Sequence, residues 1–133
     1  DVKGRVPLIS WIQAGAWNGM THDTMKFDAE TWLPCIKNHS DRTYALRVRG
    51  DSMTAPFGRS YPEGSIIFID PEKNNPDSGD RIAAKLEGEQ EATFKVFMRE
   101  ADKVWLKPLN PQHPIIMDRF EILGAVIGTW IDE

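Results

Sequence analysis

Ser52 and Lys95 are the residues of this chain whose types and surroundings suit acyl transfer. Ser52 stands in Gly50-Asp51-Ser52-Met53, directly after a segment of alternating residues. A glycine there lets the backbone turn sharply, which can expose a hydroxyl and aim neighbouring N–H groups at one point. A serine hydroxyl is a poor nucleophile without a base. Because Gly-Asp-Ser is also common in ordinary turns, the motif needs a partner before it predicts chemistry.

Lys95 is the best candidate for that base. It lies in Thr93-Phe94-Lys95-Val96-Phe97, where alternation puts Thr93, Lys95 and Phe97 on one face of a strand. An apolar neighbour such as Phe97 predicts a desolvated ammonium with a lowered pKa. At the usual lysine pKa of ~10.4, only about one amine in 2,500 is neutral at pH 7. The alternative is a surface lysine whose stem lies along an apolar side chain.

Other reactive residue types give no competing site. His22, His39 and His113 have no second His, Cys or carboxylate at a metal-ligand spacing, so we expect no metal and no other cofactor. No Asp-x-x-His follows the serine, so a Ser-His-Asp hydrolase has no clear support. Cys35 is expected to be a small buried hydrophobe rather than a nucleophile.

Length and composition describe a single globular domain. The chain has 133 residues, 41% apolar and 27% charged, and its formal net charge is 16 − 20 = −4. A chain with this charge balance lacks the basic surface that phosphate binding demands. No apolar run in it approaches the ~20 residues of a membrane span. One cysteine and no signal peptide predict a cytoplasmic protein. Because the first residue is Asp1 rather than Met, we expect a fragment or a processed chain.

The elements that must position Ser52 and Lys95 are strands. We predict a mostly β fold, a compact small barrel or sandwich of about seven or more strands, with no pair of short helices for a helix-turn-helix. The segment 18–40 is less regular, with one short strand or turn around 27–32. The predicted strands are 6–13, 44–49, 65–70, 81–86, 92–99, 104–108 and 122–131. Ser52 therefore follows one strand directly, and Lys95 lies inside another.

Together the two motifs resemble those of the self-cleaving repressor family, which includes the LexA repressor, UmuD and, closest to this chain, the lambda-type phage repressors. Gly50-Asp51-Ser52-Met53 is similar to the family's nucleophile motif, and Thr93-Phe94-Lys95 to its lysine motif. The resemblance covers almost the whole chain and is weakest over 18–40. Further similar segments are Thr54-Ala55-Pro56, Pro62-Glu63-Gly64, Ile69-Asp70-Pro71-Glu72, Pro108-Leu109-Asn110-Pro111-Gln112 and Gly124-Ala125-Val126-Ile127.

The resemblance implies self-cleavage. Members cut their own chain at an Ala-Gly or Cys-Gly bond upstream of the serine, which here is Ala14-Gly15, expected between the first strand and a loop. Neutral Lys95 would take the proton of Ser52 Oγ, and Ser52 would attack the Ala14 carbonyl. Backbone N–H groups of Asp51 and Ser52 would stabilise the oxyanion. We expect slow unstimulated cleavage, with the loop mostly away from the serine.

The resemblance also implies partners. It predicts a homodimer, with higher oligomers left open, and the RecA–single-stranded DNA filament as co-protease in the SOS response. Operator DNA would be bound only through an N-terminal helix-turn-helix domain that is absent from residues 1–133. The apolar last strand with Trp130 is one candidate dimer surface, and a core position for Trp130 is the alternative. Two other functions remain: a dimerisation module of the same fold that never cleaves, and a hydrolase of separate substrates.

Overall fold

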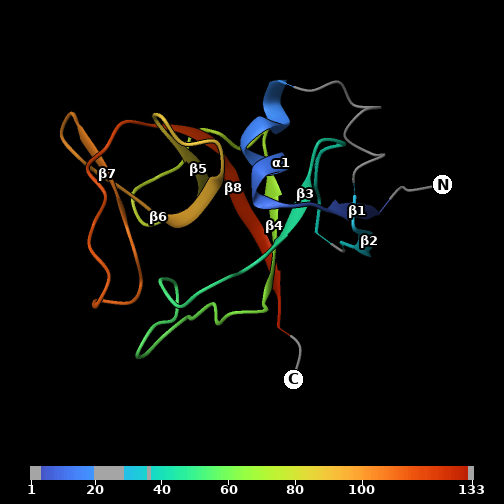
Figure 1. Cartoon of the computed structure of the whole chain (residues 1–133), viewed down its shortest axis with the longest axis horizontal. Helices are drawn as coiled ribbons and strands as arrows, with labels where there is room; N and C mark the ends of the chain where they lie inside the picture. Colours follow the sequence, from blue (N-terminus) through green and yellow to red (C-terminus); the bar gives the residue numbers. More distant parts are fainter. Residues whose placement is uncertain (1–3, 20–28, 36, 132–133) are drawn as a thin grey trace.

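The computed structural model of this chain describes residues 4–19, 29–35 and 37–131, and its strands form one eight-stranded sheet (Figure 1). The sheet has the order β2-β1-β3-β4-β8-β5-β6-β7. Neighbouring strands are antiparallel except β1 and β3, which run parallel. The elements are β1 (Arg5–Leu8), α1 (Trp11–Ala16), the 3-10 helix η1 (Trp17–Gly19), β2 (Thr31–Pro34), β3 (Tyr44–Arg47), β4 (Ile66–Asp70), β5 (Arg81–Leu86), β6 (Ala92–Glu100), β7 (Lys103–Lys107) and β8 (Phe120–Trp130). The mostly β fold of seven or more strands is confirmed.

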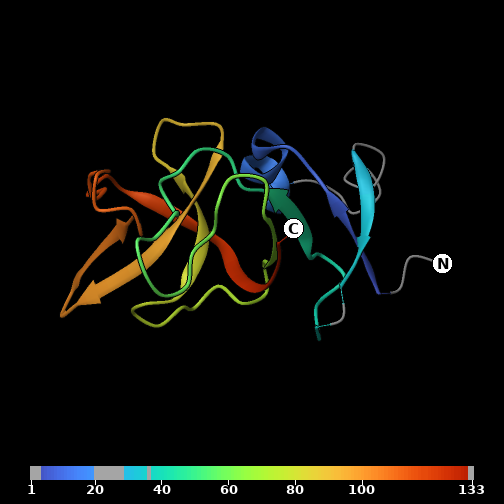
Figure 2. The ribbon, with the colours of Figure 1, turned by 90° about the horizontal axis from the view of Figure 1, so that it is seen from below.

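The long strand β8 joins the two halves of the sheet. Its first half, from Phe120 to Ala125, pairs with β5, and its second half, from Ala125 to Trp130, pairs with β4. Both ladders contain a register shift. The sheet bends strongly at this point, so that β5, β6 and β7 lie on one side and β1 and β2 on the other (Figure 2).

Both faces of the sheet are covered, because alternate residues of the central strands join different apolar clusters. Ile67 and Ile69 of β4 belong to the largest cluster, whereas Ile66 and Phe68 belong to a second one. Every residue of β4 is buried, as the apolar run 66–69 predicts for all but its last residue, Asp70. A third cluster lies under β5, β6 and β7. These clusters fix the strands that carry the candidate site.

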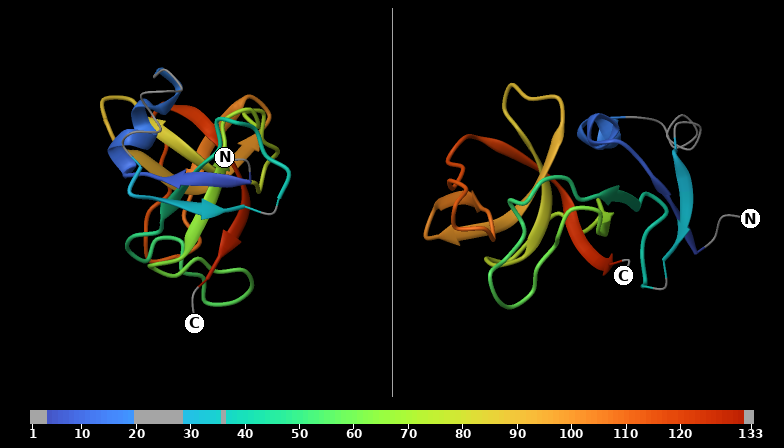
Figure 3. Two further views of the ribbon diagram at one scale, coloured as in Figure 1. Left: turned by 90° about the vertical axis from the view of Figure 1, so that its right-hand side faces the viewer. Right: turned by 60° about the horizontal axis from the view of Figure 1, so that its bottom comes forward.

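The segment after β1 is helical, and the strand predicted over 6–13 is wrong beyond Leu8. Ser10 caps the first turn of α1: its Oγ accepts from the Gln13 backbone N–H at 3.1 Å, and Gln13 Oε1 accepts from the Ser10 N–H at 2.8 Å. This reciprocal capping box satisfies two N–H groups that a new helix leaves without partners. Figure 3 shows α1 (blue) beside the turn between β5 and β6.

The less regular segment yields one strand, β2, shifted by a few residues from the predicted range 27–32. The other predicted strands differ from the observed ones by at most two residues at an end. Residues 20–28 and 36 of that segment, with His22, lie outside the described residues. Cys35 is buried and unpaired, as expected for a small hydrophobe. Among the helices in the described ranges, none is long and apolar enough to cross a membrane.

Candidate active site

Ser52 and Lys95 line the same pocket, although 43 positions separate them in the sequence. Ser52 comes from the loop after β3 and Lys95 from the middle of β6. The pocket has a volume of about 110 Å³ and is partly open to solvent. It is lined by Trp11, Val48, Arg49, Ser52, Met53, Ala92, Thr93, Phe94 and Lys95. The fold therefore brings together the two residue types that the sequence singled out.

A left-handed glycine starts the turn that carries Ser52. Gly50 has a φ of +73°, a conformation that residues with a Cβ rarely adopt. The turn is closed by the Thr54 N–H, which donates to the Asp51 carbonyl at 3.0 Å. Met53, the next residue, is fully buried and anchors the loop in the largest cluster. In the part of the chain that the structure describes, the N–H groups of Asp51 and Ser52 donate to no other group.

Lys95 lies in surroundings that favour its neutral form. Burial lowers the pKa of its ammonium, and the nearby positive charge of Arg49 lowers it further. The predicted direction is therefore found, although Phe97 does not line the pocket. Lys95 Nζ donates to Thr93 Oγ1 at 3.0 Å, and within the described ranges no hydrogen bond joins it to Ser52 Oγ. In this resting arrangement Lys95 Nζ is therefore bonded to Thr93 and not to the serine.

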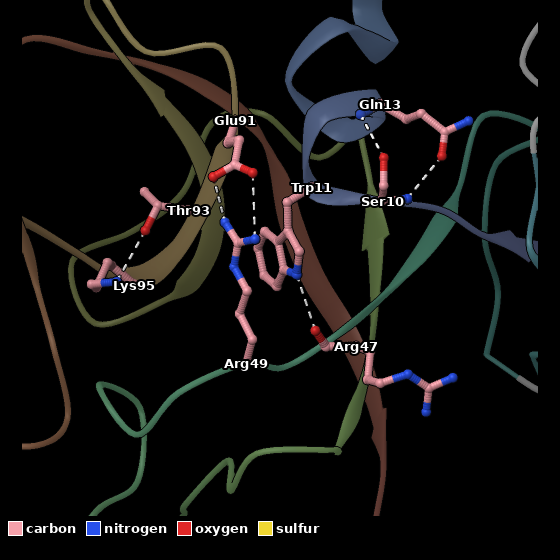
Figure 4. A network of polar contacts seen from close by, with 8 residues as sticks. All are labelled: Ser10, Trp11, Gln13, Arg47, Arg49, Glu91, Thr93 and Lys95. Atoms are coloured by element: carbon pink, nitrogen blue, oxygen red, sulfur yellow. Dashed lines mark hydrogen bonds and ion pairs between the residues drawn. The ribbon is translucent and has the colours of Figure 1, made fainter.

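Arg49 and Glu91 form a clamp beside the pocket, with Trp11 stacked on it (Figure 4). The Arg49 guanidinium bonds both Glu91 oxygens, at 2.6 and 3.4 Å. The same guanidinium lies 5.2 Å from the centre of the Trp11 ring, and Trp11 Nε1 donates to the Arg47 carbonyl at 3.1 Å. The Arg49 bond holds the pKa of the Glu91 carboxyl below its usual value. These contacts tie the first residue of α1 to the rim of the pocket.

The loop after β7 is fastened to the serine loop, which the sequence did not reveal. Asn110 N–H donates to the Ser52 carbonyl at 3.0 Å, and Asn110 Nδ2 donates to the Asp51 carbonyl at 3.1 Å. His113 Nε2 lies 2.7 Å from Asp51 Oδ1. His113 therefore has a carboxylate partner far away in the sequence, but its ring contacts Asp51 and not the serine. No local spacing signals these contacts, because they join positions about 60 residues apart.

The Ala14-Gly15 bond does not lie in the pocket. It lies inside α1 rather than in a loop, which corrects the expectation from the sequence. Ala14 is fully buried, its N–H donates to the Ser10 carbonyl at 3.0 Å, and its own carbonyl accepts from the Trp17 N–H. Gly15 has no left-handed φ, so it is not there for unusual backbone angles. A Cβ at Gly15 would overlap the Gln90 carbonyl oxygen, so glycine allows α1 to approach the turn before β6.

The other titratable residues do not form a metal centre in the described part of the chain. No group of three or more His, Cys, Asp or Glu side chains is arranged there to hold a metal ion. His39 Nδ1 lies 2.7 Å from the Lys37 carbonyl, away from the pocket. The polar side chains that line the pocket itself are those of Ser52, Lys95, Thr93 and Arg49, together with the Trp11 indole.

Comparison with known proteins finds a family model and related proteins that match nearly the whole chain. A family model described as "Peptidase S24-like" matches residues 7–127. Repressor protein C2 of Salmonella phage P22 is 46% identical over 134 residues, which cover 99% of this chain and 60% of that protein. The HTH-type transcriptional regulator for conjugative element SXT of Vibrio cholerae is 44% identical, with 99% and 62% covered. A LexA repressor of Halalkalibacterium halodurans is 41% identical over 99 residues, with 74% and 45% covered.

Proposed function

This chain belongs to the Peptidase S24-like family, and from that premise we propose that it is a latent self-cleaving serine protease domain that also dimerises a repressor. The sequence resemblance to LexA and the phage repressors is confirmed by these relatives. A repressor domain of the autoprotease type follows from the family. The Ser-Lys dyad, the bond that is cut and the stimulus are the finer parts of the proposal.

In the proposed reaction, Ser52 is the nucleophile and Lys95 the general base. Neutral Lys95 Nζ takes the proton of Ser52 Oγ as the oxygen bonds to the Ala14 carbonyl carbon. The N–H groups of Asp51 and Ser52 donate to the oxyanion. The bond to Gly15 nitrogen then breaks, and Lys95 returns its proton to that amine. Water hydrolyses the remaining ester, which restores Ser52 and leaves a carboxylate on Ala14.

The observation that carries this proposal is the shared pocket of Ser52 and a partly buried Lys95. Burial supports the base role, since it lowers the pKa of the amine and raises the neutral fraction at a given pH. The left-handed Gly50 and the uncommitted N–H groups after it support the roles of Asp51 and Ser52. A dimerisation module that never cleaves would need neither a partly buried lysine nor a left-handed turn before the serine. These features therefore favour the protease, and the dimerisation module ranks second.

The helical Ala14-Gly15 bond supports a latent rather than a constantly active protease. Its carbonyl is buried and hydrogen-bonded, so attack requires α1 to unwind and the segment to move into the pocket. Because the substrate is tethered, the step is unimolecular once the segment is there. The rate of cutting is then set by the population of the docked state.

The test is a set of matched variants followed by intact-mass spectrometry. Ser52→Ala and Lys95→Ala should keep the circular dichroism of the parent and abolish cutting between residues 14 and 15. Lys107→Ala, at an exposed lysine on β7, is the control and should cut like the parent. Cutting by either dyad variant would show that the dyad is misassigned. Efficient turnover of added Ala-Gly peptides would instead indicate a hydrolase of separate substrates.

The proposed partners belong to the whole protein. The chain spans about 60% of the length of the phage P22 and SXT repressors that it matches. We therefore propose that an N-terminal helix-turn-helix domain supplies operator binding in the cytoplasm. The RecA–single-stranded DNA filament is proposed to favour the docked segment. Cutting would separate the two domains and weaken DNA binding by losing the dimer linkage.

The end of β8 is the proposed dimer surface. Trp130 is 53% exposed and Ile131 48% exposed, so Trp130 is not a core residue. From Val126 to Trp130, the described strands pair with β8 only on the β4 side, which leaves backbone groups for a second chain. Trp130→Ala should weaken the dimer constant from sedimentation, and an unchanged constant would move the interface elsewhere.

A further inference from the structure

One aromatic side chain at the candidate active site belongs to the segment that is proposed to be cut. Trp11 lines the pocket together with Ser52 and Lys95, and it stands three positions before Ala14. In the observed arrangement the start of α1 lies at the pocket while the bond itself points into the core. The segment cannot present Ala14 to Ser52 without moving Trp11 first.

Two groups hold Trp11 there: the Arg49 guanidinium, which lies over its ring, and the Arg47 carbonyl, which accepts from its indole N–H. The Arg49 guanidinium bonds the Glu91 carboxylate on one side and stacks on the Trp11 ring on the other, as Figure 4 shows. Glu91 directly precedes β6, the strand that carries Lys95. A planar guanidinium suits this place, because it can form a bidentate ion pair and an aromatic stack at the same time. An ordinary exposed ion pair would not also contact the residue that begins α1.

We propose that Arg49 is a positioning residue that selects which part of the chain occupies the Ser52–Lys95 pocket. With Glu91 and Trp11 it forms a latch that holds α1 in its helical place and keeps the Ala14-Gly15 bond away from Ser52. Whatever displaces the Arg49 guanidinium from Trp11 frees the segment to unwind and dock. The contact that holds α1 is a property of the resting chain. Only its effect on the rate of cutting rests on the proposed self-cleavage.

The strength of the latch suits a device that must open. Its ion pair and its stack are partly exposed, and such contacts shift a conformational equilibrium by small factors. Loss of the Glu91 contact should therefore raise the open population by about two- to fivefold. Loss of the indole N–H bond to the Arg47 carbonyl should raise it by about two- to tenfold. Neither change should unfold the domain.

The test measures the latch without cleavage, in a Ser52→Ala background. Backbone amide exchange of residues 11–16 is compared for the parent, Arg49→Gln, Glu91→Gln and Trp11→Phe. Arg47→Gln is the matched control, because it removes a side-chain pair with Glu30 and leaves the backbone carbonyl that accepts from Trp11. Glu91→Gln and Trp11→Phe should exchange faster by the factors above, and Arg49→Gln should exchange at least as fast as Glu91→Gln, because it also removes the contact with the Trp11 ring. The double variant Arg49→Gln with Glu91→Gln should exchange no faster than Arg49→Gln alone, since the two substitutions share the one ion pair that Glu91→Gln removes.

Cleavage is then measured with Ser52 restored. Glu91→Gln leaves the positive charge of Arg49 near Lys95. Its cleavage rate should therefore rise by the same factor as its rate of backbone amide exchange in residues 11–16. Equal exchange in Arg49→Gln, Glu91→Gln and Arg47→Gln would overturn the latch. So would faster exchange together with slower cutting by Glu91→Gln. If exchange rises but neither the parent nor any variant cuts, the latch stands and the self-cleavage proposal fails.

Discussion

Replacing Gly50 tests whether the turn before Ser52 depends on a left-handed backbone. Gly50 has a φ of +73°, and a Cβ there would meet no atom within 4 Å. The substitution Gly50→Ala therefore carries a conformational cost and no steric one. A residue with a Cβ in the left-handed region costs about 1–2 kcal/mol. The free energy of unfolding should fall by that amount.

Asparagine at the same position separates backbone conformation from the mere presence of a side chain. Asparagine enters the left-handed region more readily than alanine, so Gly50→Asn should cost less than Gly50→Ala. Both variants are placed in a Ser52→Ala background so that no cutting disturbs the equilibrium. For a domain of this size, the melting temperature should fall by roughly 3–6 °C for each kcal/mol.

Urea denaturation followed by tryptophan fluorescence gives the two free energies. We expect the free energy of unfolding to be lower for Gly50→Ala than for Gly50→Asn. That of Gly50→Asn should be no higher than that of the chain with Gly50. If the two variants are equally stable, or if alanine matches glycine, the turn does not depend on the φ of Gly50. With Ser52 present, Gly50→Ala should also slow self-cleavage, because the serine and its N–H groups leave their positions.

Three further outcomes are expected. The rate of unassisted cleavage should rise about tenfold per pH unit and level off below the usual lysine pKa of ~10.4, because the pKa of Lys95 is lowered and the neutral amine is the active form; a plateau only above that value would contradict the base role. Tyr44→Phe should raise the free energy of unfolding by about 1 kcal/mol in urea titrations, since the buried Tyr44 hydroxyl has no hydrogen-bond partner among the described residues; a loss of that size would contradict it. Asn110→Ala removes the hydrogen bond that the side-chain amide donates to the Asp51 carbonyl, so it should slow cleavage without changing backbone amide exchange in α1. A cleavage rate that stays unchanged by mass spectrometry would show that the Asn110 side chain does not position the Ser52 loop.

Strands were predictable where their pattern is local. The uninterrupted apolar run of β4 and the alternation through β3 and β6 place these strands within two residues of their observed ends. The helix α1 was missed because Val6 to Gln13 is rich in apolar and β-branched residues, which favour a strand. The signal that could have found it was Ser10 with Gln13 three positions later, the spacing of a capping box.

The candidate site was predictable only as far as its motifs extend. Ser52 and Lys95 were singled out by type and resemblance, and their shared pocket follows from the way the loop after β3 meets β6. The Arg49–Glu91 pair and the Asn110 contacts join distant positions with no spacing rule between them. These residues lie near the ends of β3, β6 and β7, and a one-dimensional pattern does not show how the ends of those strands meet.

The most direct test of the central claim is intact-mass spectrometry of the parent and of Ser52→Ala over roughly pH 7 to 10, with circular dichroism at each pH. The parent should divide into residues 1–14 and 15–133, faster as pH rises, while Ser52→Ala keeps its full mass. The same incubation with the RecA–single-stranded DNA filament should speed the cut. A parent that stays intact and folded throughout, filament included, or a Ser52→Ala chain that still divides there, would contradict the account.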